Sequence, residues 1–307
     1  MSAASTVRGR VVKVTGSGLF RWLAFGVFWG YLVVRWLYQW VGADLLGMDP
    51  RAPLLPVETF RTLATTWDGT RIGGLFSFLR VAGDALPAAV TGTWLTIILT
   101  VVAMAAGLVI AVPLAVTRVY GGPVTRWAAL GYTELIRGTP LLAQLFVLYY
   151  GLSLSATLRE LPFVGEGFIP AQAALVAMIG FTINSSAYQA EYIRSALQSV
   201  EVGQLTAGRA VGLSKLQTIR RIVLPQGLRY GIPGWSNELV YLIKYSSLAA
   251  FITVPELYKR TRDIASGNFR YFELLVVAGV IYLGLVLSAS ALMGRVEQRV
   301  AIPGLGE

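Results

Sequence analysis

The chain has 307 residues, of which 55% are hydrophobic and only 14% are charged, with a mean hydropathy of +0.62. Soluble domains carry about a quarter charged residues, so this composition indicates a membrane protein. The absence of histidine and cysteine leaves zinc, haem, iron–sulfur and thiol chemistry with almost no ligands. The net charge of +10 fits the basic cytoplasmic loops of membrane proteins better than nucleic-acid binding. We therefore expect contact with a lipid bilayer and none with nucleic acid.

Six stretches are candidates for membrane-spanning helices, each of which needs roughly 20 mostly apolar residues. Four are free of charge and lie within residues 84–118, 137–159, 166–191 and 273–295; two carry charges, residues 22–41 with Arg35 and residues 230–253 with Glu238 and Lys244. The first stretch is rich in Trp and Tyr and is not followed by a small-residue cleavage site, so we interpret it as a retained helix. The prediction is an all-α membrane protein with about six spans.

The distribution of basic residues predicts the orientation of these helices. The tail 1–21 contains four basic residues and no acid, which places it in the cytoplasm. Six spans then place the polar loop 191–229 and the tail 301–307 in the cytoplasm, and the connection 42–86 outside. The external segment 254–273 contains four basic and three acidic residues, so its charge does not follow the expected excess of basic residues on the cytoplasmic side.

The polar loop predicts a helix–turn–helix. Residues 195–204 and 206–211 suit short helices, Gly212 suits a left-handed turn, and Ser214 suits the cap of a further helix that Pro225 would end. Apolar residues recur at helical spacing in this last helix: Leu213, Leu216, Ile219, Ile222 and Val223. Such an element either docks a soluble partner or lies on lipid headgroups; the residues alone leave both open.

Several motifs occur in order along the chain: 132-YTELIRGTPLL-142, 144-QLF-146, 149-YYG-151, 184-NSSAYQAE-191, 198-QSV-200, 203-GQ-204, 224-LPQ-226, 237-NE-238, Lys244 and 246-SSL-248. With this series, residues 88–300 resemble the membrane subunit of polar amino acid uptake systems, which are ATP-binding cassette importers. The loop around Gly212 resembles the EAA loop by which such permeases dock their ATPases.

The resemblance implies a type I ABC importer permease fold, with a five-helix core at 87–300 and an extra N-terminal helix at 22–41. It implies four partners: an ATPase dimer, a second permease subunit (the same or homologous), an extracytoplasmic solute-binding protein and an amino acid substrate. An opine or an ectoine-like zwitterion is the alternative substrate. None of the four lysines follows a glycine, so the phosphate-binding loop of an ATPase is absent. The chain is therefore expected to be no enzyme and to bind no cofactor, with ATP and Mg held by the partner.

The resemblance also assigns residues to the contact with the ATPase: Gln204, Thr206, Ala207, Gly208, Gly212, Leu213 and Leu216. Two departures stand out. Thr206-Ala207-Gly208 replaces the usual Glu-Ala-Ala, which removes the acid that commonly engages the ATPase, and Tyr245 stands where Asp is frequent.

Polar side chains within the spans are candidates for the substrate path, because they are costly in lipid unless they face protein or water. They are Asn184, Tyr188, Asn237, Glu238, Tyr241, Lys244 and Ser247. Asn237 and Lys244 share one helical face, and Glu238, Tyr241 and Tyr245 share another. The alternative is that they join helices structurally, the role we expect for Glu134 with Arg137 and for Arg35. Two other functions remain open: a stand-alone secondary transporter, for which inverted repeats are not evident, and a membrane enzyme, for which catalytic groups are scarce.

Overall fold

The computed structural model describes residues 15–166, 169–201 and 203–300, and within these ranges the chain is helical, with no β-strand. It forms two compact units, Met1–Pro50 and Arg51–Glu307, which we describe separately.

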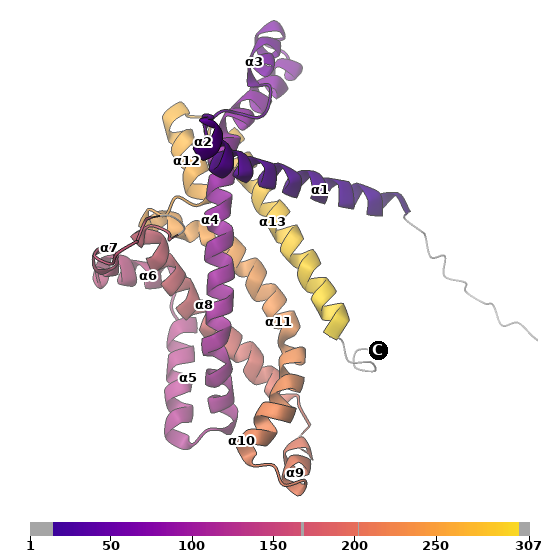
Figure 1. Cartoon of the computed structure of the whole chain (residues 1–307), viewed down its shortest axis with the longest axis vertical. Coiled ribbons are helices and arrows are strands. Elements are labelled where there is room, and N and C mark those ends of the chain that lie inside the picture. Colours follow the sequence, from indigo (N-terminus) through magenta and orange to yellow (C-terminus); the bar gives the residue numbers. More distant parts are fainter. Residues whose placement is uncertain (1–14, 167–168, 202, 301–307) are drawn as a thin grey trace, which may run out of the picture. The chain divides into compact units, whose positions relative to one another are not determined.

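The N-terminal unit contains α1 (Thr15–Leu37), a π-helical segment (Tyr38–Gly42) and α2 (Ala43–Leu46) (Figure 1). Arg35 is fully buried in it and donates a hydrogen bond to the carbonyl of Pro50. Its guanidinium also lies 5.0 Å from the centre of the Tyr38 ring, and Trp36 stacks on Trp40 at 6.2 Å. The charge in this predicted span is thus satisfied by local contacts.

The core unit begins with α3 (Val57–Thr66) and α4 (Arg71–Tyr120). With 50 residues, α4 is about 75 Å long, more than twice the roughly 30 Å thickness of the hydrocarbon core. The helix starts at Arg71, where Thr70 caps it by accepting a bond from the Gly73 N–H, and it continues without a break through the expected boundary at residue 87. Part of the connection 42–86 is therefore an extension of the first core helix.

The next core span differs from the sequence prediction. We expected a loop up to Arg137 and one helix between Arg137 and Arg159. Instead, residues 123–151 form a broken helix, made of α5 (Pro123–Arg137), α6 (Leu141–Phe146) and a π-helical turn (Val147–Gly151), followed by the short α7 (Leu154–Arg159). The helical stretch 141–151 would cover only about 16 Å, so it needs α5 to cross a bilayer.

The remaining elements are α8 (Gln172–Gln198), α9 (Gly203–Ala210), α10 (Lys215–Thr218), a π-helical segment (Ile219–Val223), α11 (Leu224–Tyr245), a 3-10 segment (Ser246–Ile252), α12 (Leu257–Asn268) and α13 (Tyr271–Val300). Among the described residues, five helical segments build the bundle: α4, α5 with α6, α8, α11 and α13. Figure 1 shows α9 and α10 at one end of it, the end at which α4 finishes and α5 begins. We call this the loop end.

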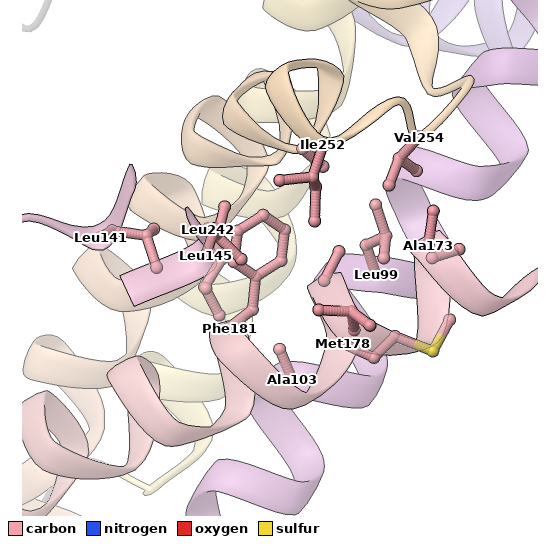
Figure 2. Packing of buried hydrophobic residues seen from close by; sticks show 14 residues of the cluster. Leu99, Ala103, Leu141, Leu145, Ala173, Met178, Phe181, Leu242, Ile252 and Val254 are labelled. Carbon is pink, nitrogen blue, oxygen red and sulfur yellow. The ribbon is translucent and has the colours of Figure 1, made fainter. Parts of the chain in front are cut away.

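The main apolar cluster joins α4, α6, α8 and α11 near the other end (Figure 2). Leu99, Leu145, Phe181 and Leu242 are almost fully buried there, together with other apolar side chains that include several alanines. Small residues let the helices approach closely, as is typical of membrane bundles. At Gly107 of α4, a Cβ would lie 2.8 Å from the Gln189 side chain of α8.

By length and hydropathy, two helices of the described ranges, α4 and α13, could cross a membrane on their own. Helix α8 is more polar, but its polar residues are buried within the bundle, including Asn184, Ser185 and Gln189. Polar residues that face the bundle interior are compatible with a span. The count of six spans stays a prediction.

Candidate functional site

The break between α5 and α6 is held by side-chain amides. Pro140 interrupts the helix, and the Gln144 Nε2 donates to the carbonyl of Ile136 at 2.7 Å and to the Thr139 hydroxyl at 2.8 Å. The Asn184 Nδ2 of α8 donates to the Gln144 Oε1 at 3.0 Å, and Asn184 is buried. The side chain of Asn184, predicted for the substrate path, therefore fixes the break to α8.

A charge cluster lies nearer the loop end. Glu191 of α8 accepts a hydrogen bond from Arg118 of α4 at 2.6 Å and another from the Arg194 Nε at 3.0 Å. Arg137 of α5 lies 3.5 Å from both Glu191 and Glu134, which confirms the predicted Glu134–Arg137 pair. The Arg137 guanidinium also lies 5.6 Å from the Tyr188 ring, so this candidate path residue borders the cluster. The cluster ties three helices together.

One face of α11 is exposed in the single chain. Asn237, Tyr241 and Lys244 lie on it, with Tyr245 stacked on Tyr241 at 5.9 Å. The Lys244 ammonium lies 5.4 Å from the centre of the Tyr241 ring. Asn237 and Lys244 share this face as predicted, but Tyr241 and Tyr245 belong to it too and are separated from Glu238. Ser247 is half-buried, and its hydroxyl donates to the Lys244 carbonyl at 2.8 Å.

Glu238 points the other way. It is 4% exposed and lies close to Ser185 of α8, with Tyr192 nearby. Of the two charges in this helix, Lys244 is thus exposed on an open face, whereas Glu238 lies between α11 and α8.

The polar loop folds largely as the sequence predicts around its turn. Gly212 has a φ of +82°, the left-handed conformation that favours glycine. Ser214 and Gln217 form a capping box at the start of α10, and the Lys215 ammonium donates to the Tyr120 carbonyl at 2.9 Å. This bond holds the loop against the end of α4.

Two details of the loop were predicted wrongly. Residues 195–198 complete α8 and residues 203–204 begin α9, so the residues expected to form one short helix at 195–204 are divided between two helices. The chain also stays helical through Pro225, which lies at the start of α11, the helix that directly follows the π-helical segment Ile219–Val223.

Gly208 explains part of the unusual Thr206-Ala207-Gly208 sequence. Gly208 is buried in α9, and a Cβ there would lie 2.4 Å from the Cγ2 of Thr218 and 2.7 Å from its Oγ1. The alanine usual at this position would therefore collide with Thr218, and glycine lets α9 and α10 pack together.

The predicted apolar stripe divides between two directions. Ile219 and Val223 are buried against the bundle, whereas Leu216 is 71% exposed. Val211 is 75% exposed, and Thr206 and Ala207 are exposed as well. Gln204 and Leu213 are half-buried. The loop thus presents a small, mostly apolar surface away from the bundle: Ala207, Val211 and Leu216.

Sequence reasoning missed the roles of Gln144 and Arg118. Gln144 lies in one of the motifs given above, but its hydrogen bonds to Ile136 and Asn184 form only because the helix is broken. Arg118 pairs with Glu191 across 73 positions, a separation for which a single sequence carries no signal.

The comparisons with known proteins agree with this geometry. Residues 103–302 match the family described as "Binding-protein-dependent transport system inner membrane component", which covers about two thirds of the chain. The chain belongs to this family and is a permease subunit of an ATP-binding cassette importer.

Relatives are similar over the same region. The chain is 37% identical to the probable amino-acid ABC transporter permease protein YckA of Bacillus subtilis, over 72% of this chain and 93% of that protein. It is 36% identical to the glutamine transport system permease protein GlnP of Escherichia coli, over 71% and 95% of the two chains. It is also 36% identical to the nopaline transport system permease protein NocM of Agrobacterium fabrum, over 70% and 88%.

Solved structures confirm the type I importer fold. A crystal structure of an amino acid ABC transporter with histidines superposes with a TM-score of 0.60 at 31% identity, over 70% of this chain and 94% of that chain. The MetNI methionine ABC transporter in an inward-facing conformation has a TM-score of 0.59 at 17% identity, over 70% and 97%, and supports the fold alone.

Proposed function

We propose that this permease imports polar amino acids and that the exposed face of α11 lines their path. The observation that carries the proposal is the exposure of Asn237, Tyr241 and Lys244, three polar or amphipathic side chains in a predicted span. In lipid such a face is costly, so it needs water or protein opposite. A second permease subunit, the same or homologous, would enclose it and leave a polar cavity in which the Lys244 ammonium can attract the substrate carboxylate.

ATP hydrolysis on the partner would be coupled to transport through the polar loop. The surface of Ala207, Val211 and Leu216 stands away from the bundle, while Ile219 and Val223 anchor its helix inside. The Lys215–Tyr120 bond and the packing of Gly208 on Thr218 make the loop a firm unit. An ATPase dimer docked there could shift α11 as a rigid body, because the chain stays helical from Lys215 to Tyr245. ATP and Mg would bind to that partner.

The basic residues support a cytoplasmic loop end and cytoplasmic termini in the inner membrane. An extracytoplasmic solute-binding protein would then deliver the substrate to the opposite end. The family description and the names of the amino acid permeases above support both partners and the substrate class.

A second substrate class is an opine, an amino acid conjugate. It is favoured by the 36% identity to a nopaline permease and 38% to an octopine transport system permease protein of Rhizobium meliloti. Both classes share the α-carboxylate that Lys244 would attract, so this face does not separate them.

The test is uptake into proteoliposomes that contain the permease, its ATPase and the binding protein encoded beside it. A panel of radiolabelled neutral, acidic and basic amino acids, nopaline, octopine and ectoine would be compared. The proposal expects ATP-dependent uptake of at least one polar amino acid. Uptake of opines alone would establish the second class, and uptake of none of the panel would refute the substrate assignment.

A further inference from the structure

A small basic cavity opens between α4, α5 and α8 at the loop end. Its volume is about 90 Å³, and it is lined by Arg118, Arg126, Leu130, Arg194 and Gln198. The space open to the centre of a single water is roughly 10–15 Å³, so the cavity has room for a group of several heavy atoms.

The charges around the cavity do not balance. Arg118 and Arg194 share the carboxylate of Glu191, and Arg118 lies 3.9 Å from Glu134. Counting Arg137, which contacts the same two acids, four guanidinium groups surround two carboxylates. The Arg126 guanidinium has no ion-pair partner among the described residues. The excess of two positive charges calls for an anion with several acceptor oxygens, for which arginine forks are well suited.

Two apolar side chains near Arg126 in α5 are strongly exposed. Trp127 is 70% exposed and Val124 is 82% exposed, on either side of Arg126 in the sequence. Exposed tryptophan beside arginine is typical of the headgroup level of a membrane, where the ring lies among lipids. With the loop end in the cytoplasm, as the proposed orientation has it, this corner meets the leaflet that is rich in anionic lipids.

We propose that the cavity binds the phosphate of an anionic phospholipid, with Arg126 as its primary ligand and Arg118 and Arg194 behind it. The acyl chains would pass over Val124 and Trp127. Since Arg118 and Arg194 also hold Glu191, the lipid would lock the ends of α4, α5 and α8 to one another. This inference is independent of the transported substrate and depends only on the orientation.

The test is native mass spectrometry of the purified full chain in detergent, titrated with phosphatidylglycerol and with phosphatidylcholine of the same acyl chains. Arg126→Gln removes the unpaired charge without breaking an internal ion pair. Arg221→Gln, an exposed arginine at the same end outside the cavity, is the matched control. We expect preferential retention of phosphatidylglycerol by the wild type, and an apparent affinity about fivefold lower in Arg126→Gln but unchanged in Arg221→Gln.

Four results would overturn the proposal. Equal retention of the two lipids would show no headgroup recognition, and equal losses in both variants would show a diffuse surface effect. Displacement of phosphatidylglycerol by millimolar inorganic phosphate in the wild type but not in Arg126→Gln would assign the cavity to free phosphate. If Arg126→Gln instead retains the lipid and weakens binding of the ATPase, an acidic protein partner occupies the cavity.

Discussion

Gly208 and Thr218 lie in contact across the turn of the polar loop, and no side chain larger than hydrogen fits at Gly208, because the Thr218 Cγ2 would be 2.4 Å from its Cβ. Thr218 is fully buried, and its hydroxyl donates to the Ser214 carbonyl at 3.0 Å, which holds its side chain in place. This contact sets how α9 rests on α10, and therefore which way the exposed surface of the loop points.

Gly208→Ala should therefore weaken coupling. Overpacking of this kind costs about 1–3 kcal/mol, and we expect less stimulation of the ATPase by the permease and slower uptake at normal expression. Thr218→Ala removes the Cγ2 and Oγ1 that collide, so the double variant should recover part of the lost activity. Normal ATPase stimulation and uptake by Gly208→Ala, or lower activity in the double variant than in Gly208→Ala, would contradict the proposed contact.

The amide pair at the helix break predicts a stability effect. Asn184→Leu leaves Gln144 without its partner, which should cost about 1–3 kcal/mol and lower the thermal unfolding temperature in detergent. Gln144→Leu should cost more, because it also removes the bonds to Ile136 and Thr139. The two changes together should cost less than their sum, because they remove one shared interaction. Asn237→Leu, on the exposed face of α11, is the control and should leave unfolding nearly unchanged. Strict additivity of the first two would disprove the link.

The exposed face of α11 predicts a transport effect without loss of fold. Lys244→Met should insert and assemble normally, while uptake of acidic or neutral amino acids falls about tenfold, equivalent to ~1.4 kcal/mol, and that of basic ones falls less. Lys259→Met is a suitable control, because Lys259 pairs with Asp263 in α12. Glu238→Ala should instead reduce the amount of folded protein, since Glu238 is buried against α8. Full and unselective uptake by Lys244→Met would remove this residue from the path.

The orientation can be tested directly because the chain has no cysteine. Single cysteines at Ser199, at the loop end, and at Thr62, in α3, both stand at exposed positions. In intact cells an impermeant thiol reagent should label Thr62→Cys and spare Ser199→Cys until the membrane is opened. Labelling of Ser199→Cys in intact cells would show that the orientation is opposite to the one proposed.

The sequence predicted the parts of this molecule that depend on local chemistry. The left-handed Gly212, the Ser214 cap and the Glu134–Arg137 pair all follow from residues within four positions of one another, and the structure confirms them. The helix break at Pro140 depends instead on bonds made by the Gln144 and Asn184 side chains, whose partners the sequence did not indicate.

The features that the sequence did not predict depend on which face of a helix is covered by its neighbours. Helical spacing correctly separated Glu238 from Lys244 but placed Tyr241 with Glu238, because a helix face has no sharp edge and only the packing of α8 defines it. The long start of α4 was also missed, because the predicted span was bounded by charged residues, and Arg71, Arg80 and Asp84 all lie in the first part of this helix.

Leu216 offers the most direct test of whether the loop couples a separate ATPase to transport. Leu216→Asp places a charge in the exposed apolar surface, and loss of an interface anchor costs about 2 kcal/mol, near 30-fold in affinity. In proteoliposomes with the ATPase and binding protein, the wild type should take up substrate only with ATP. Leu216→Asp should lose both uptake and stimulated hydrolysis, whereas Leu216→Met should keep them. Uptake by the wild-type permease without ATPase, or full ATP-driven uptake by Leu216→Asp, would contradict the account.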